Sequence, residues 1–289
     1  MKLLFLLIGV AFAAAVNIEQ STFPQIKWID PNRYYEGRGN SVHLGRVEDS
    51  GERPALDGEV AYQVGIFADR GVFCGGALIS ERAVLTAAHC IDGRHIWEIY
   101  LGTNDLSLAT ENSMRVLVSM HAVLHEDYDV LTNANAVGLI ILPDAVTFAD
   151  KVSPVLLPKV TQQDKWENKD IEPIVSGWGI TSRSELANPT VLNVTKALLV
   201  SNSACEEIYG SDAIFSSTIC LGIQTPNPGP CPGDAGGPIV IDDNGEKVLI
   251  GIVSWGPRQE CRSTMPQIAT STTSYLKWIA DHGGPNVRP

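Results

Sequence analysis

The sequence lacks a long hydrophobic run after its first 15 residues. No later segment approaches the roughly 18 apolar residues that a membrane-spanning helix needs. It also lacks a long run of like charges, a fixed-period repeat and a low-complexity segment. The net charge of −12 is spread over the chain as mixed Asp and Glu. This charge pattern argues against binding to nucleic acids or to anionic membranes.

The N-terminus, MKLLFLLIGVAFAAAVN, has one lysine followed by apolar residues and then by small residues around Ala13 and Ala15. This pattern is typical of a cleaved secretory signal and predicts a signal peptide over residues 1–15. A membrane anchor is the alternative, but the apolar run is well short of a spanning helix. We therefore expect a secreted, extracellular protein.

No two cysteines have the short spacing typical of a zinc site, and His89 is the only histidine next to a cysteine. We therefore expect no metal site and no cofactor. Because an exported chain reaches an oxidising compartment, its cysteines are expected to form disulfides. Six cysteines allow 15 pairings, among which the sequence alone does not choose. They are Cys74, Cys90, Cys205, Cys220, Cys231 and Cys261.

The texture of the chain changes near Val47. Residues 16–46 contain Pro24, Pro31 and several glycines, without sustained periodicity, and are interpreted as a propeptide or linker. Residues 47–289 contain short apolar runs, such as YQVGIF and KVLIGIVSW, separated by Gly, Pro, Asn and Asp. Many short strands at regular turn spacing predict an all-β sandwich or barrel over this domain.

Two segments depart from the strand texture. NSACEEIYG at residues 202–210 predicts a short helix. TSTTSYLKWIADHGG at residues 270–284 predicts a C-terminal helix, with Thr272 or Thr273 as the N-cap and Gly283 as the stop.

Four short motifs follow one another along the chain: LTAAHC at 85–90, SGWG at 176–179, CPGDAGGP at 231–238 and SWG at 254–256. Their order and spacing resemble those of chymotrypsin-like serine proteases. The resemblance covers residues 47–282 and implies two packed six-stranded antiparallel β-barrels with the site in the cleft between them. It also implies the disulfides Cys74–Cys90, Cys205–Cys220 and Cys231–Cys261.

The resemblance places the catalytic positions at His89, Ala136 and Ala235. The family mechanism needs a hydroxyl nucleophile, an imidazole base and a buried carboxylate that orients the imidazole. His89 fills the base position, whereas HEDYDVLTNANAVGLIIL at residues 125–142 puts Ala136 at the carboxylate position and CPGDAGGP puts Ala235 at the nucleophile position. Since a strand rises about 3.3 Å per residue, Asp127 and Asp129 are too far from position 136 to supply the missing carboxylate.

The loop around the nucleophile position keeps other family features. Backbone N–H groups of Gly233 and Ala235 would still form the oxyanion hole. Asp234 corresponds to the aspartate that receives the new α-amino group after propeptide cleavage. Arg46 and Val47 resemble the cleaved bond, but the following EDSGERPA is two residues too long and has one glycine where the family has two.

The specificity pocket departs from the family pattern as well. Its floor position is Gly229, so the acidic floor for Lys or Arg substrates is missing. MPQIAT at residues 265–270 puts Gln267 where a glycine normally keeps the pocket open. Ser254, Trp255 and Gly256 remain as the wall strand, and Trp255 is expected to offer a partner an aromatic anchor on the cleft wall.

These features predict a secreted, non-catalytic serine protease homologue that binds a protein partner, such as a protease, an inhibitor or a cascade component. One alternative is a chymotrypsin-like or elastase-like endopeptidase inactivated by engineered alanines. Natural drift explains better why Gln267 and the activation segment also depart from the pattern. Another alternative is a carrier that binds a small molecule in the old cleft.

Asn193 begins the single N-glycosylation sequon, NVT. It is expected on an exposed loop. An occupied and an unoccupied site remain open alternatives.

Overall fold

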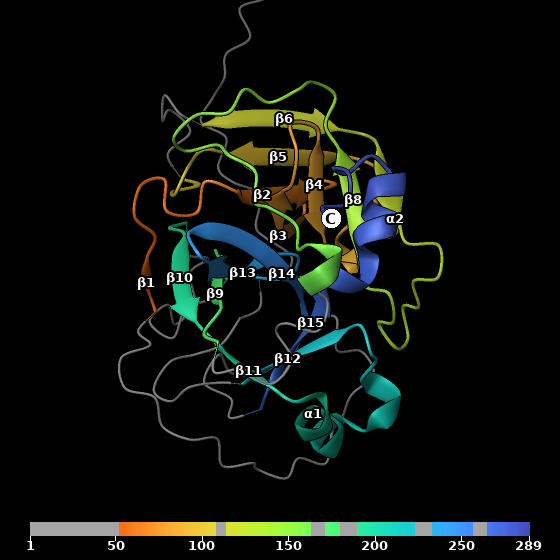
Figure 1. Cartoon of the computed structure of the whole chain (residues 1–289). Helices are drawn as coiled ribbons and strands as arrows, with labels where there is room; N and C mark the ends of the chain where they lie inside the picture. Colours follow the sequence, from red (N-terminus) through yellow and green to blue (C-terminus); the bar gives the residue numbers. More distant parts are fainter. Residues whose placement is uncertain (1–51, 108–113, 163–170, 180–189, 223–232, 257–264) are drawn as a thin grey trace, which may run out of the picture.

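The computed structural model describes residues 52–107, 114–162, 171–179, 190–222, 233–256 and 265–289. These residues form two curled antiparallel sheets, one above the other in Figure 1, with few helices. The predicted signal peptide (1–15), propeptide (16–46) and activation bond lie outside the described residues. No helix in the described part is long and apolar enough to cross a membrane.

The first sheet closes on itself through a bent strand. Its order is β6-β5-β2-β3-β4-β8-β7. Only Met120 and His121 separate β6 from β7, and the Ser119 hydroxyl donates to the Ile141 carbonyl at this corner (2.7 Å). Since β6 pairs with β5 while β7 pairs with β8, the two act as one strand of a six-stranded barrel. The bounds are β2 (Gln63–Ala68), β3 (Val72–Leu78), β4 (Ala83–Thr86), β5 (Trp97–Leu101), β6 (Arg115–Ser119), β7 (Ala122–Leu124) and β8 (Gly138–Ile141).

The second sheet closes in the same way. Its order is β1-β10-β9-β13-β14-β15-β12-β11, and Ala197 alone separates β10 from β11. With β10 and β11 as one bent strand, six strands form the barrel and β1 is an outer addition. The predicted pair of six-stranded barrels is therefore confirmed. The bounds are β1 (Arg53–Pro54), β9 (Ile174–Gly177), β10 (Asn193–Lys196), β11 (Leu198–Val200), β12 (Thr218–Gly222), β13 (Pro238–Asp243), β14 (Glu246–Trp255) and β15 (Gln267–Ser271).

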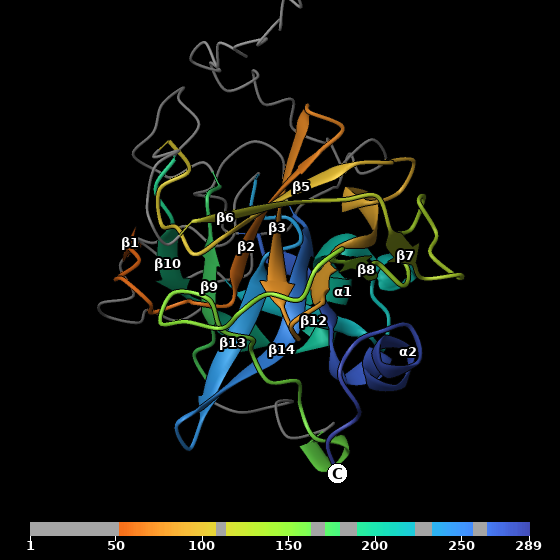
Figure 2. The same ribbon diagram turned by 90° about the horizontal axis from the view of Figure 1, so that it is seen from above.

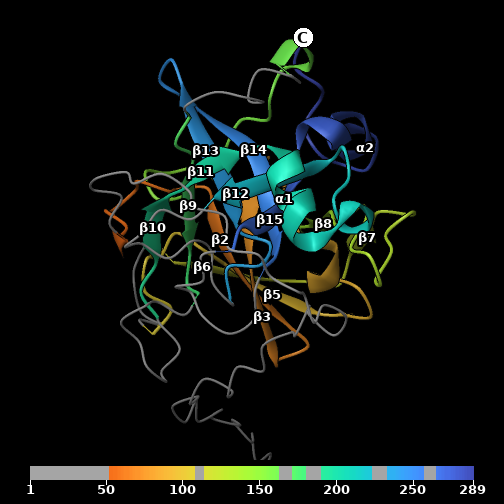
Figure 3. The same ribbon diagram turned by 90° about the horizontal axis from the view of Figure 1, so that it is seen from below.

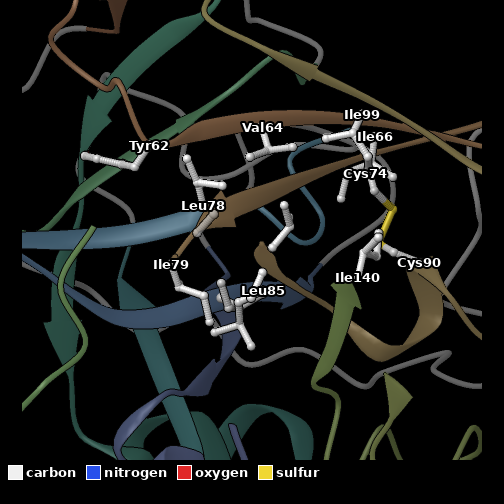
Figure 4. Packing of buried hydrophobic residues seen from close by; sticks show 14 of the residues in the cluster. Tyr62, Val64, Ile66, Cys74, Leu78, Ile79, Leu85, Cys90, Ile99 and Ile140 are labelled. Atoms are coloured by element: carbon white, nitrogen blue, oxygen red, sulfur yellow. A yellow bond between two sulfur atoms is a disulfide. The ribbon is translucent and has the colours of Figure 1, made fainter. Parts of the chain in front are cut away.

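The first barrel is filled by aliphatic side chains from facing strands (Figure 4). β-Branched and leucine side chains suit a pleated, fully enclosed surface, which explains why these short apolar runs form strands. Each such burial stabilises the fold by about 1.5–3 kcal/mol. Fully buried examples are Val64, Ile66, Leu78, Leu85, Ile99 and Ile140.

The two barrels share this core. Trp178, Leu249 and Ile252 of the second half belong to the same buried cluster as the first barrel. The Ser176 hydroxyl donates to the Gln63 side-chain carbonyl (2.6 Å), which joins β9 to β2. β13 lies against β3, and Figures 2 and 3 show the two sheets overlapping when the molecule is seen from above and from below. The relative position of the barrels is thus set by common packing.

Helix α1 (Asn202–Tyr209) forms where it is predicted. The Ser201 hydroxyl accepts a hydrogen bond from the Ala204 N–H (3.3 Å) and caps the first turn.

Helix α2 (Leu276–Asp281) confirms the predicted C-terminal helix, but its predicted cap is wrong. A 3₁₀ turn (Thr273–Tyr275) precedes it, and the Thr272 hydroxyl donates to the Leu249 carbonyl of β14 instead. Tertiary packing therefore competes successfully for the capping hydroxyl. Gly283 has φ 101° and ends the helix as predicted.

Helix α2 packs beside β8 and clamps the segment that leads into it (Figure 1). Trp278 stacks on His125, with ring centroids 5.1 Å apart, and its indole N–H donates to the Glu126 carboxylate (2.7 Å). The Tyr275 hydroxyl donates to the Asn135 side-chain carbonyl (2.9 Å). The C-terminal helix and the 3₁₀ turn before it thereby fix the chain on both sides of residues 127–134.

The expected loop position of Asn193 is wrong. Asn193 begins β10, where it pairs with Gly177 of β9 and Pro54 of β1. Its side-chain amide donates to the Val191 carbonyl (3.0 Å). Val194 of the sequon is buried and contributes to the core, which explains why this polar-looking stretch forms a strand.

Disulfides Cys74–Cys90 and Cys205–Cys220 are present as predicted. Cys231 and Cys261 lie outside the described residues, so their bond stays a prediction. Peptide mapping without reduction is expected to recover all three pairs. A free thiol or an exchanged pair would contradict the assigned register.

Replacing both Cys74 and Cys90 by alanine is expected to lower the free energy of unfolding by about 3 kcal/mol, because the bond closes a loop over a sequence separation of 16. Denaturant unfolding of this double variant beside the wild type measures the loss. An unchanged midpoint and slope would show that the bond does not constrain the unfolded chain.

Candidate functional site

His89 is held at the end of β4 by its neighbours in sequence. It occupies a 3₁₀ turn (Ala88–Cys90), and Cys90 is bonded to Cys74 of β3. The Trp97 indole N–H donates to the Cys90 carbonyl (3.3 Å). The disulfide and this hydrogen bond fix the backbone beneath the imidazole.

The His89 imidazole is buried and has no hydrogen-bond partner. Its side chain is 8% exposed, and neither Nδ1 nor Nε2 finds a partner. Burial, helped by the positive charge of Arg94, lowers the pKa of His89 to about 4. The ring is therefore neutral at pH 7.

Ala136 lies where the segment before β8 enters the core, 1% exposed. Its carbonyl accepts a hydrogen bond from the Thr270 hydroxyl of β15 (3.3 Å). Two residues later, Gly138 pairs with Thr86 of β4, just before the turn that carries His89. The backbone thus brings Ala136 to the region of His89 and presents a methyl group there.

The nearby aspartates do not replace a carboxylate at Ala136. Asp129 accepts hydrogen bonds from the N–H groups of Leu131 and Thr132 within its own loop (2.7 and 3.2 Å). Asp127 is exposed. As expected, neither of them bonds to the imidazole of His89.

Ser254 of β14 is a second buried polar side chain without a partner. It is 2% exposed, and its hydroxyl has no hydrogen bond. Ile252, two residues earlier, pairs with Thr270, whose hydroxyl holds the Ala136 carbonyl. Ser254 therefore lies on the strand that passes the Ala136 region.

Ala235 is fixed by backbone hydrogen bonds. Its carbonyl accepts from the Gly75 N–H of β3 (2.8 Å), and the next N–H, of Gly236, donates to the Val253 carbonyl (2.8 Å). Gly236 has φ 81°, and a Cβ there would collide with the Thr86 hydroxyl and the Gly75 carbonyl. The loop thus requires glycine, and it places Ala235 against the strands that lead to His89.

Asp234 is seated in the SGWG segment. Its carboxylate accepts a hydrogen bond from the Gly179 N–H (2.8 Å). A Cβ at Gly177 or Gly179 would collide with this carboxylate, so the two glycines make room for it. Gly233 adopts φ 102° at the expected oxyanion position. Arg46 and Val47 lie outside the described residues, and the activation bond stays a prediction.

Gln267 covers the backbone of the SWG strand. It lies at the start of β15, 6% exposed, and pairs with Leu221 of β12. A Cβ on Gly256 would collide with the Gln267 carboxamide. The amide thus lies directly against the wall of the expected pocket. The expected floor residue, Gly229, lies outside the described residues.

Trp255 does not offer the expected aromatic anchor. Its side chain is only 5% exposed and packs edge to face with Tyr209 of α1, with ring centroids 5.0 Å apart. The Tyr209 hydroxyl donates to the Pro266 carbonyl, which holds this pair between α1 and β15. Because it packs against α1, the Trp255 indole is part of the buried core.

Arg94 was not identified from the sequence. It follows the His89 turn, with its N–H bonded to the Ile91 carbonyl (3.0 Å), and its charge acts on the imidazole. The Nε of Arg94 is buried without a partner. The sequence shows an arginine five residues after His89, but whether its side chain lies near the imidazole depends on the fold.

The side chains brought together are a neutral imidazole, a buried hydroxyl and two methyl groups, beside a fixed backbone loop. Among the described residues, no group of His, Cys, Asp and Glu could hold a metal ion. This arrangement can donate hydrogen bonds, but it presents no hydroxyl at residue 235.

Comparison with known proteins agrees with this architecture. The family model described as Trypsin matches residues 49–279. Trypsin-1 of Astacus astacus is 34% identical over 72% of this chain and 86% of that protein. Chymotrypsin of Phaedon cochleariae is 33% identical over 96% of this chain and 95% of that protein. A solved HL collagenase structure matches with TM-score 0.70 and 32% identity, over 79% of this chain and 95% of that one. The chain belongs to the trypsin family of serine proteases and has the chymotrypsin fold.

Proposed function

We propose that this protein is a non-catalytic member of the family that acts by binding a protein partner. The observation that supports this most strongly is the pair of buried, unpartnered side chains, His89 and Ser254, in the region where Ala136 and Ala235 present methyl groups. In a working site, a carboxylate and a nucleophile would bond to the imidazole.

The chemical argument for a non-catalytic protein is that position 235 has no hydroxyl. A methyl group at Ala235 can neither lose a proton nor attack a carbonyl. Removing the serine alone lowers turnover by about 10⁶ in enzymes of this mechanism, and the effects of triad members are not additive. The loss of a carboxylate at Ala136 therefore adds little further damage.

The alternative is an endopeptidase in which alanines replaced a serine and an aspartate. The Asp234 carboxylate is compatible with it, because the aspartate that the family uses to receive the new α-amino group is present and accepts a hydrogen bond from Gly179. The Gln267 amide against Gly256 favours the non-catalytic function, because it occupies space that a substrate side chain would need.

The proposed site of action is extracellular. The signal-like N-terminus and the two disulfides support secretion. The proposed partner is a protease, an inhibitor or a cascade component. Affinity capture from the native secretion tests this, and a small molecule retained without any protein would favour a carrier instead.

The purified protein is expected neither to hydrolyse peptide esters nor to react with serine-directed acylating reagents, because both reactions need the hydroxyl that Ala235 lacks. Mass spectrometry and an ester assay measure this beside an active trypsin-family enzyme as control. Stoichiometric labelling would refute the proposal.

Ala235→Ser alone is expected to restore little activity. The imidazole would still lack its orienting carboxylate, whose loss lowers turnover by about 10⁴. Comparing kcat of this variant with that of Ala136→Asp combined with Ala235→Ser measures the difference. Equal kcat values would show that residue 136 is not the carboxylate position.

Gln267→Gly is expected to raise kcat/KM of this double revertant for an aromatic substrate at least about tenfold, equivalent to about 1.4 kcal/mol of transition-state stabilisation. The reason is that the amide against Gly256 narrows the pocket. Gln267→Leu is the matched control: it keeps the side-chain bulk and should give no gain. If the double revertant already cleaves as well as the triple revertant, Gln267 does not block the pocket.

A further inference from the structure

Among the described residues, half of the four buried polar side-chain atoms without a partner belong to His89. In the part of the chain that the structure describes, they are Nδ1 and Nε2 of His89, Oγ of Ser254 and Nε of Arg94. Each buried polar group left without a hydrogen bond carries a substantial desolvation penalty. Such groups are rare in folded proteins, so the unpaired atoms of His89 and Ser254 point to a missing acceptor or donor.

The Ala136 segment connects the strand of Ser254 with the turn of His89. Its carbonyl is held by Thr270, which pairs with Ile252 just before Ser254, and Gly138 of the same segment pairs with Thr86 just before the His89 turn. The strand that carries Ser254 and the turn that carries His89 thus reach the Ala136 segment from the two barrels. Ala136 is buried and presents only a methyl group.

The chemistry of these groups favours a small anion. The Ser254 hydroxyl and an imidazole N–H can both donate, so they match an acceptor. The charge that acts on His89 is the positive charge of Arg94, and no described carboxylate acts on it. The group absent from Ala136 relative to aspartate is one carboxyl group, which is the size of formate.

We propose that a small carboxylate of formate size binds beside Ala136 and accepts hydrogen bonds from Ser254 and His89. This inference rests on the proposed function, in which position 136 is the carboxylate position and carries alanine. No acidic side chain of a partner can replace the small ion, because Ala136, Ser254 and His89 are all buried.

Binding would have two measurable consequences. A carboxylate beside the imidazole favours its protonated form and raises the pKa of His89 from about 4. A ligand that binds only the folded state also raises the unfolding temperature in proportion to its occupancy.

The test is a titration of the full chain with sodium formate, compared with sodium chloride at equal ionic strength. NMR signals of the His89 ring are followed across pH, and the unfolding temperature is measured in parallel. Formate is expected to raise the pKa of His89 by at least about 1 and to raise the unfolding temperature. Identical results in formate and chloride would overturn the proposal.

Formamide is the matched neutral ligand. It has nearly the same shape as formate but no charge, so it should leave the pKa of His89 unchanged. An equal effect of formamide would overturn the proposal of an anion site.

Two variants locate the site. Ala136→Asp supplies the carboxylate covalently, so it should raise the pKa of His89 by itself and abolish the response to formate. Ser254→Ala removes one donor and should weaken formate binding at least about fivefold, since one hydrogen bond to a charged group is lost. A formate response that survives in both variants would place the ion elsewhere and overturn the proposal; if Ala136→Asp does not fold, Ser254→Ala and formamide decide.

The two proposals fail separately. Ester hydrolysis by the wild type would refute the non-catalytic function while leaving a formate response measurable. A catalytically inert protein without a formate response would refute this inference alone.

Discussion

The arrangement of the site depends on one close approach between the backbones of the two barrels. The Gly75 N–H donates to the Ala235 carbonyl, and a Cβ on Gly75 would lie 2.8 Å from the Gly237 Cα. Cys74 precedes Gly75 and is bonded to Cys90, next to His89. A glycine contact and a disulfide therefore fix residues 89 and 235 relative to each other without any catalytic side chain.

This dependence on the backbone explains which parts of the site the sequence could predict. The glycines of GDAGGP and SGWG and the cysteine of LTAAHC have packing roles that only those residue types can fill, so their spacing reports the loop geometry directly. The barrels could be predicted for a related reason, since short apolar runs between turn residues fit buried strands. The bends at Met120 and Ala197, which close the barrels, leave no comparable signal.

The incorrect expectations concern side chains whose positions depend on distant neighbours. Trp255 is core because Tyr209 of α1 packs on it, and Thr272 does not cap α2 because the Leu249 carbonyl takes its hydroxyl. Burial lowers the pKa of the His89 imidazole, and Arg94 matters because its positive charge lowers this pKa further. None of these contacts has a local pattern, whereas the position of Gln267 could be inferred because it replaces a residue within a motif.

The small side chains at positions 136 and 235 also change the energetics of the cleft. A buried carboxylate costs several kcal/mol of desolvation that its partners must offset. Alanine removes that cost but leaves the Ser254 hydroxyl and the His89 imidazole without partners, at about 1–3 kcal/mol each. Because the imidazole stays neutral at pH 7, it does not itself add an uncompensated buried charge, and the fold tolerates the exchange. The fold therefore does not depend on reactive side chains at positions 136 and 235, because backbone contacts such as the Gly75–Ala235 hydrogen bond join the barrels.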